Sequence, residues 1–195
     1  GLKKLFGSFV FMVYEPAEDT FLMRDALPAS LTGLKVLEVG SGSGFLSVEA
    51  ARRGGEVVAV DVDPAAVRAT RKSALDAKVT VVACEGDLFE PVQGEVFDLV
   101  ICNPPYLPDE PKDPDIALDG GPQGWEYIDR FLAGVGEVLS EDGRVLLLFS
   151  SHSMPDMVAL SLHKHGFVSK LLKRLEVGFF EELFVVELVR DVAAR

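Results

Sequence analysis

The stretch "LEVGSGSGFLS" (residues 37–47) decides the fold of this chain. It places three glycines directly after the pattern of a buried strand and directly before the pattern of a helix. Glycine permits a tight turn at such a point and lets a ligand approach the backbone closely. Phe45 stands where the dinucleotide fingerprint Gly-x-Gly-x-x-Gly has its third glycine. Because glycine turns also serve purely structural purposes, this one indicates a ligand site only together with its surroundings.

Short apolar runs alternate with helical patterns along the rest of the chain. Strands are predicted over 35–39, 56–60, 79–83, 97–102, 144–149, 167–175 and 183–189, and helices over 45–53, 64–77, 125–139 and 155–165. Strands separated by helices form a mainly parallel sheet with helices on both faces. The last two strands are joined by a hairpin-length connection, so one of them should run antiparallel. We therefore expect a single α/β domain over 1–195, Rossmann-like, with seven strands and an antiparallel strand in a C-terminal hairpin.

Polar side chains gather at the predicted strand ends. Glu38 lies within the first strand, and Asp61, Asp87 and Asn103 follow the second, third and fourth. Ligands of open α/β sheets bind at the carboxyl ends of the strands, and a buried carboxylate such as Glu38 is costly unless it binds something. Asp61 can accept both hydroxyls of a ribose. This acidic set disfavours a pyrophosphate and fits S-adenosylmethionine, which carries a ribose, an ammonium group, a sulfonium and no phosphate.

The stretch "DLVICNPPYLP" (residues 98–108) ends a strand in an amide followed by two prolines. The Asn103 side-chain oxygen and the Pro104 carbonyl can each accept one N–H of a planar amino group, and the Tyr106 ring can pack against it. Proline fixes φ and withholds an N–H, so these carbonyls are not drawn into a following helix. Asparagine cannot act as a base, so orientation of the substrate nitrogen is the expected mechanism.

Composition and net charge count against several classes of protein, among them nucleic-acid-binding and membrane-spanning proteins. The net charge of −12 counts against a standing nucleic-acid surface. We expect no membrane span, no metal site, and buried, reduced thiols at Cys84 and Cys102, which favour an intracellular location. The three histidines are expected on the surface. The loop over 107–124, rich in Pro, Asp and Gly, is predicted to lie on the substrate side.

The chain resembles the class I S-adenosylmethionine-dependent methyltransferases and, more narrowly, the HemK-like protein-glutamine methyltransferases. Three stretches carry the resemblance: "VYEPAEDTFLM" (13–23), "LEVGSGSG" (37–44) with "VDVDP" (60–64), and "NPPYLP" (103–108) followed by "ALDGGPQGWEYIDRFL" (117–132). The residues of the first stretch resemble those of the archaeal and eukaryotic branch of the family. That branch implies methylation of the glutamine in the Gly-Gly-Gln loop of a translation release factor in the cytoplasm. It also implies a small zinc-binding activator subunit.

The resemblance also implies roles for individual residues. It places catalysis on Asn103, to which the chemistry of the corner adds Pro104 and Tyr106 as expected catalytic residues. It places contacts to S-adenosylmethionine on Thr20, Glu38, Gly40, Gly42, Gly44, Asp61, Val62, Asp87, Leu88 and Asn103. The N-terminal segment over 1–30 would cover the cofactor, although the residues alone also allow a plain helix start with Asp19 or Thr20 as its cap.

Three other functions are left open by the residues. An N6-adenine DNA methyltransferase would use the same Asn-Pro-Pro-Tyr corner, but the negative charge counts against it. A protein lysine methyltransferase is a second alternative. A catalytically inactive, cofactor-binding assembly subunit is the third, and the intact Asn103 and glycine turn count against that one.

Overall fold

The computed structural model describes residues 17–104 and 124–194. Its helices are α2 (Glu18–Ala26), α3 (Phe45–Arg52), α4 (Pro64–Ala77), α5 (Glu126–Val135) and α6 (Pro155–Lys164), with short 3-10 turns η1 (Glu90–Val92), η2 (Ser151–Ser153) and η3 (Val192–Ala194). Its strands are β1 (Lys35–Val39), β2 (Glu56–Asp61), β3 (Val81–Glu85), β4 (Phe97–Cys102), β5 (Leu139–Ser150), β6 (Phe167–Val177) and β7 (Glu181–Arg190). Tyr106, the loop over 107–123 and the segment over 1–16 lie outside the described residues.

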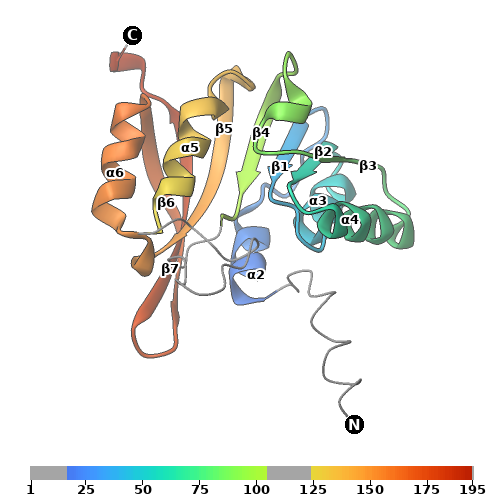
Figure 1. The fold of residues 1–195 in the computed structure, drawn as a ribbon, viewed down its shortest axis with the longest axis horizontal. Coiled ribbons are helices and arrows are strands. Elements are labelled where there is room, and N and C mark those ends of the chain that lie inside the picture. The colour runs from blue at the N-terminus through green and yellow to red at the C-terminus, as the bar shows by residue number, and fades with distance from the viewer. Residues whose placement is uncertain (1–16, 105–123, 195) are drawn as a thin grey trace.

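The seven strands form one sheet in the order β3-β2-β1-β4-β5-β7-β6 (Figure 1). Strands β1 to β5 pair in parallel, and β7 runs antiparallel between β5 and β6. The prediction of seven strands with an antiparallel strand in the final hairpin is confirmed. The chain moves outward from β1 through β2 to β3 and then returns to the other side of β1 with β4. The order therefore reverses between β1 and β4, where open sheets of this kind bind ligands.

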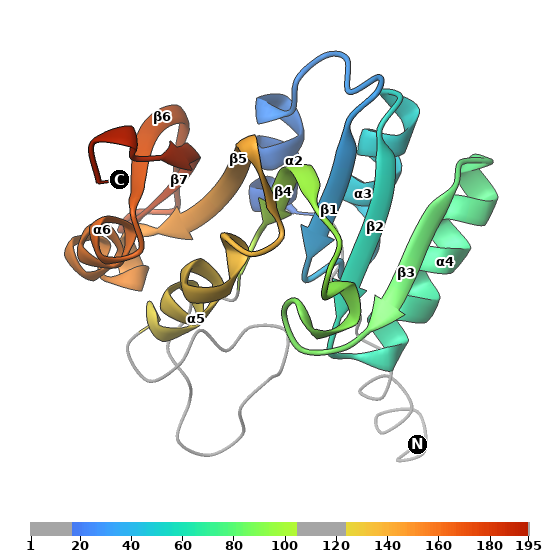
Figure 2. The same cartoon turned by 90° about the horizontal axis from the view of Figure 1, so that it is seen from above.

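Helices cover both faces of the sheet, as predicted, with α2, α3 and α4 on one face and α5 and α6 on the other (Figure 2). Side chains of a strand alternate between faces. On β1, Leu37 and Val39 pack toward α5 and α6, whereas Val36 packs with α2 and α3. The same alternation directs Glu38 toward α3.

Several predicted boundaries differ from the structure. The fifth strand spans Leu139–Ser150 instead of 144–149, and the last two strands span Phe167–Val177 and Glu181–Arg190 instead of 167–175 and 183–189. The third strand begins at Val81 instead of residue 79, because Lys78 takes a left-handed conformation (φ 58°) and the Val79 amide donates to Ala74, which ends α4. The predicted helix over 125–139 ends at Val135, and Leu139 instead pairs with Phe97 at the start of β5.

Two predictions of burial also differ from the structure. Cys102 is buried, but Cys84 is only half-buried because β3 is an edge strand. His152 and His163 are exposed as expected, whereas His165 is largely covered, with its Nε2 3.0 Å from Asp129 Oδ1. Within 17–104 and 124–194, no helix has the length and apolar character that crossing a membrane requires.

Candidate active site

The glycine turn and Asn103 lie side by side at the point where the strand order reverses. Val39 of β1 pairs with Cys102 of β4, so Gly40 and Asn103 are each the first residue beyond their strand. The structure thus brings together the two motifs that the sequence singled out, from positions about sixty residues apart.

Each glycine of the turn has positive φ: 80° at Gly40, 53° at Gly42 and 85° at Gly44. Gly44 has a packing reason as well, because a Cβ there would lie 2.7 Å from the Thr70 Cα of α4. Nothing lies within 4 Å of a Cβ built on Gly40. Gly40 therefore borders open space in which a ligand can approach the backbone, while Gly44 holds α3 and α4 together. A direct cofactor contact of Gly44 stays a prediction.

Asp61 fixes the shape of this turn. Its Oδ2 accepts a hydrogen bond from the Gly42 amide at 3.0 Å, and its Oδ1 accepts one from the Asp63 amide at 2.9 Å. Burial raises the pKa of Asp61 above its usual value, and the two amide bonds oppose this increase. The carboxylate thus links the end of β2 to the glycine turn, at the place predicted to bind ribose hydroxyls.

Glu38 is 2% exposed, and its Oε1 accepts a hydrogen bond from the Ser47 hydroxyl of α3 at 2.7 Å. Burial raises the pKa of Glu38 to about 8, and the nearby Asp61 raises it further. Glu38 is therefore largely protonated at pH 7. Because its partner is a neutral hydroxyl, a cation brought to the turn would favour the ionised carboxylate. This chemistry fits the ammonium and sulfonium groups of the predicted cofactor.

The end of β3 supplies the third part of the crevice. Asp87 is exposed and pairs with Arg130 of α5 at 2.7 Å, so one of its oxygens already has a cationic partner. Leu88 has φ +53°, an uncommon conformation for a residue with a side chain. Val62, beyond β2, leaves an apolar side chain 45% exposed. These residues can form the walls of a pocket for a flat, amino-bearing ring, although their contacts to it stay predictions.

Asn103 presents a buried acceptor in a fixed orientation. Its Nδ2 donates to Asp19 Oδ2 at 2.9 Å, and its Oδ1 is buried without a hydrogen-bond partner among the residues that the structure describes. An ionised carboxylate can only accept, so the amide must turn its NH₂ group toward Asp19. The Oδ1 atom is left to accept an N–H from a substrate, and an unmet acceptor of this kind is costly enough to indicate a ligand. Pro104 follows and is buried.

Helix α2 carries Asp19 and Thr20 on its buried face. The helix begins at Glu18 after the N-cap Ala17, which makes no side-chain cap bond, so the alternative of Asp19 or Thr20 as a cap is wrong. Both side chains point into the molecule and are nearly covered, at 4% and 6% exposed.

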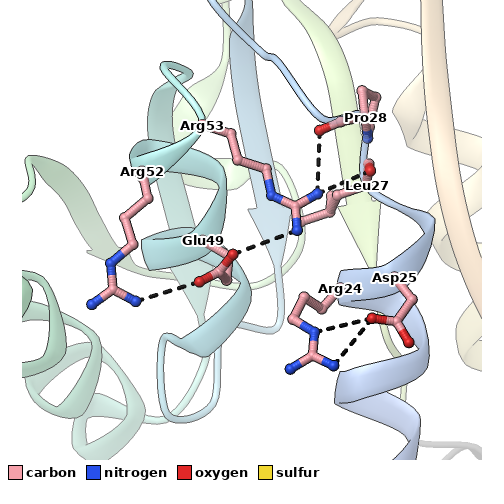
Figure 3. Close-up of polar contacts among 7 residues, drawn as sticks. All are labelled: Arg24, Asp25, Leu27, Pro28, Glu49, Arg52 and Arg53. Atoms are coloured by element: carbon pink, nitrogen blue, oxygen red, sulfur yellow. Dashed lines mark hydrogen bonds and ion pairs between the residues drawn. The ribbon is translucent and has the colours of Figure 1, made fainter.

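At its other end α2 is attached to α3 through Arg53, the residue that directly follows α3 (Figure 3). The guanidinium donates to the carbonyls of Leu27 at 3.0 Å and Pro28 at 3.2 Å, and it pairs with Glu49 at 3.5 Å. A cation at the C-terminal end of a helix also matches the helix dipole. Arg53 therefore fixes the C-terminal end of α2, the helix that carries Asp19.

Sequence reasoning missed three residues of this site: Asp19 as the partner of Asn103, Arg53, and Tyr127. Burial raises the pKa of Tyr127 well above its usual range, and the charges of Cys102, Asp61 and Asp87 add to the increase. Tyr127 packs against the apolar cluster that contains Val39 and Cys102, the last residues of β1 and β4. Asp19 had a usable signal, since Asp19, Met23 and Leu27 recur at every fourth position and so share the buried face of α2. Arg53 and Tyr127 had none.

The chain matches the family described as methyltransferase small domain over residues 8–170. It is 39% identical over 180 residues to a Methanocaldococcus jannaschii protein named as a protein N5-glutamine methyltransferase, covering 89% of this chain and 90% of the other. It is 37% identical over 169 residues to human methyltransferase HEMK2, covering 79% of each.

Among solved structures, the chain is similar to the E. cuniculi Mtq2–Trm112 complex, which is responsible for the methylation of the translation termination factor eRF1. The TM-score is 0.74 at 29% identity, and the match covers 91% of this chain and 98% of the other.

Proposed function

Because the chain belongs to the methyltransferase small domain family, together with the glutamine methyltransferases that it matches, we propose that it methylates a protein glutamine in a translation release factor. The methyl donor would be S-adenosylmethionine, and the acceptor would be the side-chain nitrogen of the Gly-Gly-Gln loop. Such a substrate would place the reaction in the cytoplasm. The observation that carries the proposal is the buried Asn103 Oδ1 atom, held by Asp19 next to the glycine turn.

The residues of the crevice fit the cofactor. Gly40 leaves room for a close approach, Asp61 lies where a ribose would bind, and Glu38 can ionise beside a cation. When bound, S-adenosylmethionine supplies an electrophilic methyl group. The chain's own residues then have to align the nitrogen that receives it.

A glutamine nitrogen is a poor nucleophile because its lone pair is delocalised into the carbonyl. Asn103 Oδ1 would accept one N–H of the glutamine, and the Pro104 carbonyl would accept the other. Two acceptors at fixed directions hold the NH₂ group in line with the methyl group and favour a pyramidal nitrogen. Orientation of this kind can lower a barrier by about 7–11 kcal/mol in favourable cases. After transfer the sulfonium would have become a neutral thioether, and the methylated nitrogen would lose one proton to solvent water, because neither acceptor is a base.

Lysine and adenine are weaker candidates for the acceptor. A lysine ammonium must lose a proton before transfer, and the group offered to it would be an amide oxygen, which is not a base. Adenine has a suitable NH₂ group, but a chain with net charge −12 repels the DNA backbone.

We further propose a small zinc-binding activator subunit, for which the Trm112 partner of Mtq2 is the precedent. Of the two edge strands, β3 is the better place for it. The β6 edge carries Lys170, Lys173 and Arg174, and charged residues protect an edge from pairing. The β3 edge instead exposes the apolar side chain of Val82. A chain that is monomeric, stable and fully active alone would contradict this part of the proposal.

The test offers radiolabelled S-adenosylmethionine to the full chain, with and without a Trm112-type partner. Four substrates are compared: a release factor, the same factor with its Gly-Gly-Gln glutamine replaced by alanine, histone protein as a lysine source, and double-stranded DNA. We expect label only on the unmodified release factor. Label on DNA or on histone alone would overturn the proposal.

A further inference from the structure

The hairpin between β6 and β7 ends in two exposed aromatic side chains. Phe179 is 97% exposed and Phe180 is 91% exposed, with their ring centroids 6.5 Å apart. They are the most exposed large apolar side chains among the described residues. Two adjacent rings in full contact with water are unfavourable for an isolated chain, and aromatic residues of this kind are the typical anchors of protein interfaces.

The strand register places this hairpin tip on the substrate side of the sheet. Cys102 of β4 pairs with Leu147 of β5, and Leu148 pairs with Val185 of β7, so Asn103 lies at the level of Val185. Phe180 is five residues beyond that level, which corresponds to about 15 Å along the strand direction. Two strand spacings, about 10 Å, separate β4 from β7 across the sheet. The hairpin accordingly extends past the end of β4 (Figure 1).

Side-chain contacts hold the tip in this position. His152 of η2 lies with its Nε2 3.0 Å from the Phe180 carbonyl oxygen. The Glu182 amide donates to the Ser151 hydroxyl at 3.0 Å, and the Ser150 hydroxyl donates to Glu181 at 2.7 Å. Since η2 directly follows β5, these contacts hold the backbone of the tip against the sheet, which lowers the entropic cost of ordering it on binding.

The base of the hairpin packs against α2, the helix that carries Asp19. Val177 and Leu183 pack in the same apolar cluster as Met23 of α2. A protein that touches the tip would therefore lie against the same side of the molecule as a glutamine presented to Asn103.

The charge around the rings indicates the kind of surface that they fit. Glu176, Glu181 and Glu182 surround the tip, and Arg174 pairs with Glu182. Glu181 also accepts from the Ser150 hydroxyl and lies 3.7 Å from His152, so the rings are surrounded by a rim with a small net negative charge. A complementary surface has an apolar depression with basic residues around it.

We propose that Phe179 and Phe180 form a docking site for the substrate protein, separate from the residues that hold the glutamine. The inference rests on the proposed function, since the occupant is the protein that presents the glutamine. In this arrangement the tip binds a patch of the folded substrate roughly 20 Å from its reactive loop, with that patch apolar and bordered by Lys or Arg. The enzyme then distinguishes a folded release factor from a loose glutamine peptide.

The test uses Phe179→Ser/Phe180→Ser in the full chain, purified with its Trm112-type partner. Leu160→Ser is the matched control, because Leu160 is 62% exposed on α6. Methyl transfer is measured on intact release factor and on a short peptide with the same Gly-Gly-Gln loop. Release factor binding is measured by calorimetry in parallel, so the result does not depend on turnover of the peptide. For the double variant we expect KM and Kd for the intact factor to rise about tenfold or more, with S-adenosylmethionine affinity and peptide transfer unchanged.

Each other outcome has a definite meaning. Unchanged Kd for the release factor in the double variant overturns the docking site. Loss of the Trm112-type partner, or loss of a homodimer seen in the unmodified protein, assigns the tip to a different interface and also overturns it. If the unmodified protein transfers no methyl group to the release factor, the proposed function fails, and that result is independent of the variant.

Discussion

The glycine turn and the Asn103 corner lie beside each other at one edge of the sheet, yet they are held in place differently. The glycine turn is held by residues that follow it closely in the chain: Asp61 through the Gly42 amide and Thr70 through contact with Gly44. The Asn103 corner is held by Asp19, 84 residues earlier in the chain. Asp19 is in turn positioned by α2, whose far end is bound by Arg53.

Because of this difference, we expect substitutions in the glycine turn and substitutions at the Asn103 corner to change different properties of the protein. Damage to the glycine turn should appear in both stability and cofactor affinity, because the same residues build the fold and border the ligand. Damage to the Asn103 corner should appear in the rate of transfer, because its residues orient one acceptor atom. The following changes test that separation, from the largest expected effect to the smallest.

Replacing Asn103 by alanine should have the largest effect. The change removes the Oδ1 acceptor and should lower kcat by about 1,000-fold, as removal of a single positioned hydrogen-bonding group does in other enzymes. Single-turnover transfer to release factor measures the rate, and calorimetry measures S-adenosylmethionine binding, which should weaken by about fivefold or less. Transfer at the unmodified rate would disprove the role of Asn103.

Gly44→Ala and Gly40→Ala separate packing from ligand approach within the glycine turn. Alanine at position 44 would combine a left-handed backbone with a Cβ 2.7 Å from the Thr70 Cα, and should lower the free energy of unfolding by about 3 kcal/mol. Alanine at position 40 meets open space and should cost about 1 kcal/mol. Its main effect should be weaker S-adenosylmethionine binding, by about tenfold. Denaturant unfolding and calorimetry distinguish the two, and equal stability losses would contradict this view of the turn.

Asp19→Asn tests whether Asp19 orients the Asn103 amide. The new amide can donate as well as accept, so it no longer dictates which side of Asn103 faces the substrate. We expect kcat to fall about 10- to 100-fold with little change in the melting temperature. Asp25→Asn, on the exposed side of the same helix, is the matched control and should leave kcat unchanged. A drop in melting temperature without a drop in kcat would make Asp19 merely structural.

Glu38→Gln tests the buried carboxyl through pH. The folded-state pKa of Glu38 is raised from 4.5 to about 8, so its contribution to stability is complete below about pH 4.5 and is lost as pH rises through about 8. Glutamine has no such dependence. The variant should therefore gain stability over the unmodified protein as pH rises between these values, and relative to pH 4.5 the gain should be on the order of 5 kcal/mol at pH 9. Urea unfolding at pH 5, 7 and 9 measures this difference, and a constant difference would refute it.

Arg53→Met should have the smallest effect, since Arg53 acts only through the end of α2. Loss of its bonds to the Leu27 and Pro28 carbonyls should cost about 1–2 kcal/mol of stability and reduce kcat about twofold. Arg52→Met is the matched control, because Arg52 forms only an exposed pair with Glu49 and should change stability by less than about 0.5 kcal/mol. Equal losses in the two variants would show that α2 does not depend on Arg53.

Much of the fold was predictable because its signals are local. The strand over 35–39, the helix over 64–77 and the strand over 97–102 have the predicted bounds. One of the main errors has a local cause, the end of a helix, and the other has a cause in the tertiary structure, the pairing of two strands. Nothing in the sequence marks Lys78 as a helix end, but it ends α4 in a left-handed conformation. As a result, β3 begins two residues later than predicted. Leu139 continues a helical pattern, yet pairing with Phe97 makes it the start of β5.

The candidate site shows the same division. Glu38 was recognisable because a carboxylate inside an apolar strand is anomalous wherever that strand packs. Tyr127 and Arg53 were not, because an aromatic residue or an arginine on a helix face looks the same whether it lines a crevice or faces water. Phe179 and Phe180 fall in the hairpin connection that the sequence predicts between the last two strands, but only the structure shows that both rings are almost fully exposed.

The sequence by itself determined the parallel sheet, the glycine turn and the amide at the end of β4, because periodicity and turn chemistry act over a few residues. Only the tertiary structure decided which carboxylate faces that amide and which oxygen of the site is left to accept a proton donor. It also decided where the aromatic hairpin stands relative to Asn103. These are contacts between residues far apart in the chain, and they form only when the two faces of the sheet are covered and the helices are packed.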